Sequence, residues 1–353
     1  PWVRPDPPPG PQSGGSLYNP PMGERVFIVG DGQMGLVMAS AALEAGADEV
    51  VVWGPFQESI DRMRRDGVSP RLPGWTIPDA IQLCHDVSVA ADATILVNAI
   101  PTQHVRSVWT RITPVIGIDS VDVPVVSTAK GMEVDSGLVP TAVIREVLPE
   151  APLAVLSGPT IATELARRQP AVVIAASIHP DLPARVHAAF GTDWLRIYES
   201  LDVLGVELAG ALKNIIALAA GVCDGLGLGF NAKSALLARG LAEMRRLGVA
   251  LGAEPSTFQG ISGVGDLATT CFSPDGRNRA CGEALARGCD LAEYLAAQTC
   301  VVEGVPTLES VLQRSESLDI DIPIMTAVGK VFLEGHDPRS AIHDLMTRPF
   351  RSE

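Results

Sequence analysis

The sequence lacks the positive charge and the residue patterns that mark several classes of protein. Its 353 residues include only 27 Lys and Arg against 41 Asp and Glu, which gives a formal net charge of −14 and a pI of about 4.9. A chain with this balance repels polyanions as a whole, so we expect no nucleic-acid partner.

Cysteine is scarce, and no two cysteines form a C-x-x-C pair. A chain of this length does not need disulfide staples, so we expect a reducing, cytoplasmic location. The six histidines show neither H-E-x-x-H nor a paired Cys/His spacing, and no G-x-S-x-G elbow is present. We therefore predict neither a metal site nor a serine hydrolase.

Signals for membranes and export are also weak. The run 203–222 has about the length of a bilayer span, but it carries Glu207, Lys213 and Asn214. Charges at the centre of a span are costly, so a buried helix of a soluble protein is the better interpretation. Residues 1–23 hold eight prolines and four glycines and lack the apolar core of a signal peptide, which predicts a disordered leader.

The chain as a whole is apolar enough for two cores, with 46% hydrophobic residues. Arg25–Gly30 is a buried strand by composition, 36–45 a helix and Glu49–Trp53 a second strand, which together make a βαβ unit. Further short apolar runs follow at 93–99, 123–127, 154–157 and 171–175. This alternation predicts a Rossmann-like, doubly wound and mostly parallel sheet.

The second half of the chain has a different character. From residue 201 onward, alanine- and leucine-rich stretches with helical spacing replace the β-branched clusters. We expect an α/β protein in which a dinucleotide-binding domain at 24–200 is followed by an all-helical substrate domain at 201–353. The two domains would pack across a cleft that holds the chemistry.

The segment 30–35, Gly-Asp-Gly-Gln-Met-Gly, matches G-x-G-x-x-G between a buried strand and a helix. In this pattern Gly30 permits a tight turn, Gly32 lets the backbone approach a pyrophosphate, and Gly35 lets the helix pack on the strand. We therefore predict that NAD or NADP binds here, the alternative being an ordinary strand-to-helix turn.

The choice between NAD and NADP stays open. The second strand ends in Trp53, Gly54, Pro55 and Phe56, so its tip offers neither an acid for a ribose nor an arginine for a 2′-phosphate. Three arginines follow on the next segment and are able to swing in, although a solvated helix face is the favoured interpretation. They are Arg62, Arg64 and Arg65.

Two polar residues stand in apolar surroundings. Lys213 lies within the apolar stretch 208–218, where an unpaired ammonium would cost several kcal/mol, so it needs an anionic partner, a cleft or a route to the surface. Asp266 follows two glycines in the turn 263–267 and is either that partner or a helix N-cap.

Other segments carry donors suited to an anionic substrate. Gly276–Arg279 places two arginines and an asparagine at a loop-to-helix junction, where a phosphate finds planar donors, unless the segment is simply an exposed basic patch. Lys130 directly follows a predicted strand, as does 157–160, at the edge of the sheet where ligands bind in such folds. Turn chemistry is the alternative explanation for both.

Taken together, these motifs resemble the NAD(P)-dependent glycerol-3-phosphate dehydrogenases over residues 25 to about 345. The similarity lies in eight motifs that occur in the family's order in both halves of the chain. They are 30–35, 100–103, 129–133, 157–162, 212–214, 265–266, 276–279 and 301–304.

This resemblance implies an enzyme that interconverts dihydroxyacetone phosphate and sn-glycerol 3-phosphate for phospholipid synthesis, with NAD or NADP as cofactor. Family members are commonly dimers, so a homodimer is expected. By the matching motifs, Lys213 resembles the lysine that exchanges a proton with the C2 oxygen of the substrate. Asp266 resembles the carboxylate that pairs with it, and Lys130 a cleft lysine near substrate and nicotinamide.

The resemblance also implies the binding residues. Arg277 and Asn278 resemble the grip on the substrate phosphate, and Val301 and Glu303 a segment that closes over the cofactor. The remaining implied substrate contacts are Gly158, Thr160, Asn214, Thr270 and Gly276. The implied cofactor contacts, besides the three glycines, Lys130 and Arg277, are Gln33, Met34, Trp53, Pro101 and Ala162.

The chain departs from the family pattern at a few positions. Pro55 stands where bacterial members often have an arginine, Gly276 where many have a serine, and Gln33 and Met34 where a serine and an aromatic residue are usual. Two alternative functions stay open, the first of which is motivated by Gly276, Gln33 and Met34. One is a dehydrogenase for a related phosphate or phosphonate ketone, and the other is a non-catalytic dinucleotide sensor.

Overall fold

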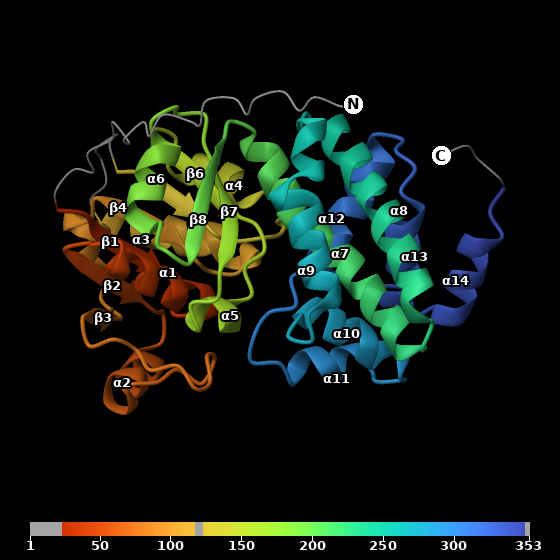
Figure 1. The fold of residues 1–353 in the computed structure, drawn as a ribbon, viewed down its shortest axis with the longest axis horizontal. Helices are drawn as coiled ribbons and strands as arrows, with labels where there is room; N and C mark the ends of the chain where they lie inside the picture. Colours follow the sequence, from red (N-terminus) through yellow and green to blue (C-terminus); the bar gives the residue numbers. More distant parts are fainter. Residues whose placement is uncertain (1–22, 117–122, 350–353) are drawn as a thin grey trace, which may run out of the picture.

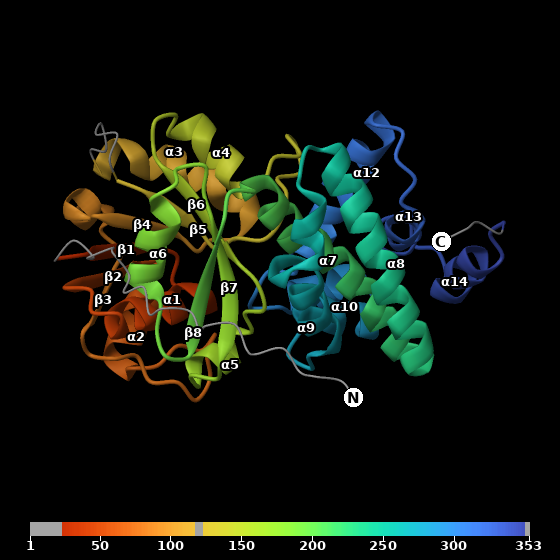
Figure 2. The ribbon, with the colours of Figure 1, turned by 45° about the horizontal axis from the view of Figure 1, so that its top comes forward.

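The computed structural model describes residues 23–116 and 123–349. A sheet flanked by helices fills one half of the molecule and a cluster of helices fills the other, as Figures 1 and 2 show from two sides. The last strand ends at Ser200, and every later element of the described chain is helical. The α/β fold with a helical second half is therefore confirmed, whereas most of the predicted leader lies outside the described residues.

The sheet has eight strands in the order β3-β2-β1-β4-β5-β6-β7-β8. The first six run parallel in the order of a dinucleotide-binding Rossmann fold, β7 is antiparallel to β6, and β8 is parallel to β7. Their bounds are Arg25–Val29 (β1), Glu49–Trp53 (β2), Ile81–Cys84 (β3), Ile95–Asn98 (β4), Val125–Ser127 (β5), Leu153–Ser157 (β6), Ala171–Ala176 (β7) and Leu195–Ser200 (β8).

Helices cover both faces of this sheet. In β1, Val26 and Ile28 face a core shared with α1, α2, α5 and α6, whereas Phe27 and Val29 face a core shared with α3 and α4. This alternation is the period of two expected for a strand between two layers. The helices are Gln33–Glu44 (α1), Gln57–Asp66 (α2), Val105–Ile116 (α3), Pro140–Val147 (α4), Ala162–Ala166 (α5) and Leu182–Phe190 (α6), with 3₁₀ turns at Val87–Asp92 (η1) and Thr102–His104 (η2).

The six strands predicted from apolar runs are confirmed, but β3 and β8 escaped the sequence analysis. β3 has only four residues, and its Gln82 is exposed, so it gives no continuous apolar run. β8 lies at the edge of the sheet and exposes Arg196 and Tyr198. Helix α1 also begins three residues before the predicted Leu36, directly after Gly32.

The helical half is built around α7 (Val203–Gly225). This helix is long and apolar enough to cross a membrane, but 89% of its most apolar window is buried inside the protein, which confirms the prediction of a buried helix. The other elements are Gly229–Ala250 (α8), Pro255–Gln259 (η3, 3₁₀), Ile261–Gly265 (η4, π-helical), Asp266–Phe272 (α9), Arg277–Ala286 (α10), Leu291–Ala296 (α11), Gly304–Ser317 (α12), Pro323–Phe332 (α13) and Pro338–Met346 (α14).

Glycines let α7 and α10 approach closely. A Cβ on Gly221 would meet the carbonyl oxygen of Arg279, and a Cβ on Gly282 would meet that of Leu218. Side chains at these two positions would push the helices apart. Because α10 starts at Arg277, this contact fixes where the phosphate-binding candidates lie relative to Lys213 on α7.

A buried carboxylate joins α7 to the sheet half. Glu207 is 2% exposed and accepts hydrogen bonds from the Thr141 backbone N–H, at 2.9 Å, and from the Thr141 hydroxyl. It thereby caps the first turn of α4. Burial raises the pKa of Glu207 to about 7.

This raised pKa predicts a pH-dependent stability. The folded protein holds a proton on Glu207 more tightly than the unfolded chain does, so the stabilisation is complete below the unfolded pKa, near 4.5, and is lost as the pH rises through about 7. In the wild type, this effect should lower the free energy of unfolding by about 1–3 kcal/mol between pH 5 and pH 8. In Glu207→Gln, this contribution to the pH dependence should be absent. Denaturant titrations at both pH values measure this, and an unchanged pH dependence would contradict it. Glu309→Gln, at an exposed position on α12, is the control.

Candidate functional site

The glycine loop fits a dinucleotide. Gly30 has φ +128°, and a Cβ there would lie 2.6 Å from the Ala99 carbonyl oxygen. A Cβ on Gly35 would overlap the Gly30 carbonyl, so helix and strand meet without an intervening side chain. Gly32, in contrast, faces open space, and no side chain caps the N-terminus of α1 that follows it. A pyrophosphate finds both room and free backbone N–H groups at this position.

The other cofactor candidates lie around this loop in different ways. Gln33 donates a hydrogen bond from its side-chain NH₂ group to the Arg71 carbonyl. Met34, the second residue of α1, packs against the core that the buried residues of α1 help to form. Pro101 precedes η2, and Ala162 begins α5. Trp53 places its indole in the core shared with α3 and α4 and donates to the His85 carbonyl at 2.9 Å, so only its backbone contacts the loop.

Three charged groups meet between the two halves. Asp266, at the start of α9, is 1% exposed, and both of its carboxylate oxygens are paired. Lys213 Nζ on α7 lies 2.7 Å from Oδ1, and Lys130 Nζ, after β5, lies 2.6 Å from Oδ2. The structure therefore gives Lys213 the anionic partner that its apolar surroundings demand, and the alternative of a surface lysine is wrong.

Lys130 is held on three sides. Its ammonium also donates to the Gly158 carbonyl at 2.7 Å and to the Thr160 hydroxyl at 3.0 Å. The pKa of Lys130 is lowered to about 8, because burial and, to a smaller extent, the neighbouring Lys213 charge outweigh the opposing effect of Asp266. Two ammonium groups share one carboxylate here, so the cluster carries an excess positive charge and attracts an anion.

A chain of amides links this cluster to the start of α10. Asn214 donates to the Lys130 carbonyl at 3.2 Å, and Asn278 donates to the Asn214 side-chain oxygen at 2.9 Å. The Asn278 oxygen accepts from the Gly304 N–H at 2.9 Å. Both the NH₂ group and the oxygen of the Asn278 amide are therefore bonded within the protein. Asn278 thus positions the start of α10 relative to Asn214 and Gly304.

The remaining phosphate candidates gather at the N-terminus of α10. Gly276 is the N-cap residue, and a Cβ there would lie 2.8 Å from the carbonyl oxygen of the buried Thr270. Arg277 is exposed and donates to the Val301 carbonyl at 3.0 Å. Neither a side-chain cap nor an acidic residue occupies the first turn of α10, so its backbone N–H groups are available to an anion.

Glu303 connects the helical half to the cofactor side of the sheet. Its Oε1 accepts from the Thr102 N–H at 2.9 Å, and its Oε2 is buried without a hydrogen-bond partner. Burial raises the pKa of Glu303 to about 7. The motifs 100–103 and 301–304 are thus brought into direct contact.

Some residues of the site were missed by the sequence analysis. A Cβ on Gly131 would lie 2.6 Å from the Thr102 hydroxyl, and one on Gly210 would lie 3.0 Å from the Ser157 hydroxyl and 3.4 Å from Lys130 Cγ. The available signal for Gly210 was an isolated glycine inside a long helical pattern, which often marks a close approach. Within the described ranges, no three His, Cys, Asp or Glu side chains are grouped as a metal would require.

Comparison with known proteins agrees with this geometry. The family model for the N-terminal part of NAD-dependent glycerol-3-phosphate dehydrogenase matches residues 25–182, and that for the C-terminal part matches residues 202–343. The chain belongs to the NAD-dependent glycerol-3-phosphate dehydrogenase family.

Individual relatives of this family match along nearly the whole chain. A glycerol-3-phosphate dehydrogenase [NAD(P)+] of Chlorobium phaeobacteroides is 41% identical over 93% of this chain and 99% of its own length, and that of Frankia casuarinae is 43% identical over 92% and 96%. The crystal structure of glycerol-3-phosphate dehydrogenase from Coxiella burnetii superposes with a TM-score of 0.88 at 32% identity, covering 93% of this chain and 100% of that one.

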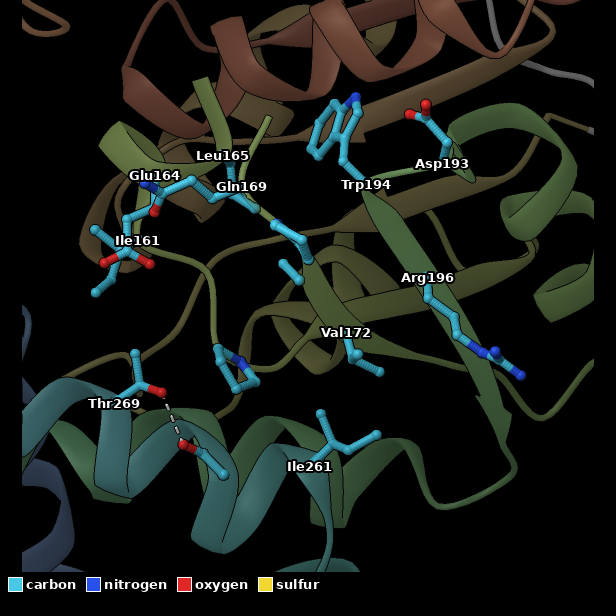
Figure 3. Close-up of a pocket in the computed structure, with 14 residues that line it drawn as sticks. Ile161, Glu164, Leu165, Gln169, Val172, Asp193, Trp194, Arg196, Ile261 and Thr269 are labelled. Carbon is cyan, nitrogen blue, oxygen red and sulfur yellow. Dashed lines mark hydrogen bonds between the residues drawn. The ribbon is translucent and has the colours of Figure 1, made fainter. Parts of the chain in front are cut away.

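The structure of the present chain also contains a groove, and this groove does not include the charged cluster of Lys130, Lys213 and Asp266. It has a volume of about 510 Å³ and lies between β7, β8 and α5 on one side and η4 and α9 on the other (Figure 3). Its lining includes Pro159, Gly265 and Thr269, which adjoin site residues, but neither lysine and not Asp266. Figure 3 shows Thr269 directed at the Gly265 carbonyl, and Val172 and Ile261 are among the apolar side chains of the lining.

The shared carboxylate predicts a strong effect on stability. Asp266→Asn leaves two buried ammonium groups without a counter-charge, so the free energy of unfolding should fall by about 3–5 kcal/mol. Asp61→Asn, which breaks the exposed pair with Arg64, should change it by less than about 1 kcal/mol. Urea denaturation of both variants measures the difference. Equal losses would show that the cluster contributes nothing beyond a surface ion pair.

Proposed function

We propose that this chain catalyses the reversible reduction of dihydroxyacetone phosphate to sn-glycerol 3-phosphate with NADH or NADPH, which feeds glycerophospholipid synthesis. The observation that carries the proposal is the Lys213–Asp266–Lys130 cluster beside the glycine loop. Lys130 follows β5, and the segments 30–35, 100–103 and 157–160 follow β1, β4 and β6. Because the carboxyl ends of parallel strands share one edge, all four segments meet where ligands bind in this fold.

The cluster suits the chemistry of a ketone. A bound nicotinamide supplies the hydride, and the carbonyl oxygen of the substrate becomes negative as its carbon is reduced. The Lys213 ammonium, whose side chain is only 9% exposed, would stabilise that charge and donate the proton. Asp266 orients Lys213 through the 2.7 Å contact, and Lys130 adds a second ammonium group on the same carboxylate.

The start of α10 suits the substrate phosphate. Arg277 provides a planar donor, and the uncapped first turn provides backbone N–H groups. Thr270 and Asn214 lie on the elements beside it, and the amide chain through Asn278 fixes the turn relative to Lys130. Binding energy from the phosphate would then position the ketone carbon for reaction.

We assign the cofactor to residues 24–200 and the substrate phosphate to residues 201–353. The end of β8 at Ser200 and the start of α7 at Val203 support this boundary, as does the break between the two family matches at 182 and 202. Gly30, Gly32 and Gly35 with Gln33, Pro101 and Ala162 would line the cofactor, and Val301 and Glu303 would close over it.

A spectrophotometric assay tests the proposal. Loss of NADH or NADPH absorbance on adding dihydroxyacetone phosphate is expected, with no loss for unphosphorylated dihydroxyacetone. Absence of turnover with both cofactors would contradict it. That result would instead support a dehydrogenase for a related phosphate or phosphonate ketone, or a non-catalytic dinucleotide sensor. The relatives favour neither of these two functions.

Lys213→Ala tests the proton donor. The variant should lose turnover by about 10²-fold to 10⁴-fold, because the general acid is removed, while still binding NADH. Stopped-flow measurement of the reduction of dihydroxyacetone phosphate gives the turnover, and fluorescence titration with NADH gives the cofactor affinity. Lys330→Ala, at an exposed position on α13, serves as the control, and retained turnover in Lys213→Ala would refute its assigned role.

Arg277→Gln tests the phosphate grip. Loss of a charged donor should raise the KM for dihydroxyacetone phosphate by about 10-fold to 100-fold and change the cofactor KM far less. Arg287→Gln removes an exposed guanidinium at the opposite, C-terminal end of α10, which pairs with Glu283, and should leave both constants unchanged. Equal rises in the two KM values for Arg277→Gln would argue against a phosphate contact.

We further propose that the enzyme is a cytoplasmic homodimer. All six cysteines are free, as expected in a reducing compartment. Large apolar side chains are exposed around the start of α8, with Phe230 81% exposed and Phe272 47% exposed, and such a surface suits a second copy. Light scattering coupled to gel filtration measures the mass in solution, and a monomer would refute the dimer.

A further inference from the structure

The tip of β2 is where the ribose of the adenosine lies in a Rossmann fold, and here the strand itself brings no charged group to it. Gly54, Pro55 and Phe56 follow Trp53, and Gly54 has no room for a side chain. A Cβ there would lie 2.8 Å from the Cγ atom of Asp31. The carboxylate of Asp31 therefore occupies the position beside the strand tip.

An arginine from a distant segment completes this corner. Arg71 Nη1 lies 3.0 Å from Asp31 Oδ2, and the Ser59 hydroxyl donates to the same oxygen at 3.2 Å. Gln33 donates to the Arg71 carbonyl, so the segment that carries Arg71 is tied to the glycine loop at two points. The corner combines the loop after β1, the first turns of α2 and the connection from α2 to β3.

The exposure of the pair shows which of the two side chains is accessible from solvent. The Asp31 side chain is 9% exposed, whereas that of Arg71 is 28% exposed. Arg71 makes no other side-chain hydrogen bond to the described part of the chain. An arginine carries five N–H donors in a fixed plane, so several remain for a second anion while Nη1 stays on Asp31.

The arginines on α2 do not share this position. Arg62 and Arg65 pair with Asp66 at 3.6 and 3.3 Å, and Arg64 bonds Asp61 and the Leu83 carbonyl. All three are exposed and none contacts the glycine loop. The favoured sequence interpretation, a solvated helix face, agrees with these contacts.

We propose that Arg71 binds the 2′-phosphate of NADPH and is held in place for it by Asp31. The proposal rests on the proposed function only in taking the glycine loop as the dinucleotide site. A phosphate matches the planar, bidentate donors of Arg71, and Arg71 offsets the repulsion that the Asp31 carboxylate would exert on a 2′-phosphate. Removing Arg71 leaves an acid at the tip of β2, the arrangement that suits the ribose of NADH.

Binding of two cofactor fragments tests this without any turnover. Isothermal titration should show that the wild-type chain binds 2′,5′-ADP at least tenfold more tightly than 5′-ADP. In Arg71→Gln this ratio should fall at least tenfold, and the ratio of the NADPH and NADH dissociation constants should move in the same sense. Arg65→Gln, which removes an exposed arginine paired with Asp66, should keep the wild-type ratio.

The 5′-ADP affinity reports whether the glycine loop is intact in each variant. If Arg71→Gln does not fold, Arg71→Lys replaces it and should lose at least threefold of the ratio, because an ammonium cannot make the bidentate contact. Equal binding of the two fragments by the wild type, or equal losses for both in the variants, would overturn the proposal. Failure to reduce dihydroxyacetone phosphate with a preserved fragment ratio would instead refute the proposed function alone.

Discussion

The buried carboxylate of Asp266 holds the functional centre of this protein together. Its two oxygens bond two ammonium groups that reach it from the sheet half and from α7. Removing three charges from water is costly, and this arrangement is stable only because each charge meets an opposite one at hydrogen-bond distance. The same requirement brings the end of β5, the middle of α7 and the start of α9 to one point.

The helical half is organised so that this point keeps its geometry. Lys213 projects from a helix that is buried along nearly its whole length, and glycines bring α10 directly against that helix. The amide chain from Lys130 through Asn214 and Asn278 to Gly304 then ties four segments into one network. A rigid scaffold of this kind positions charged groups more closely than flexible loops can.

Charge is distributed unevenly over a chain that is acidic as a whole. The net charge of −14 would repel a phosphorylated substrate and a dinucleotide, yet two lysines share one carboxylate in the centre, and Arg277 stands at an uncapped helix start. Arg71 likewise brings a positive charge next to the glycine loop, where it pairs with Asp31. Local positive charge, which is partly buried at the two lysines, outweighs the distant, screened surface charge.

The local pattern of the sequence determined the parts of the fold that depend on neighbouring residues. The strand, glycine loop and helix at 25–44 were predictable because burial of consecutive β-branched residues and the needs of a tight turn are local effects, and the burial of α7 followed from its composition. The edge strand β8 was not, because half of its side chains face solvent.

Within the site, the sequence indicated that Lys213 needs a counter-charge and that Asp266 is a candidate for it. Only the tertiary structure decided that Lys130 shares the same carboxylate, that Thr102 meets Glu303 and that Arg71, rather than the arginines on α2, pairs with Asp31. These contacts join residues 136, 201 and 40 positions apart. No local rule specifies such pairs, because they depend on how whole elements pack.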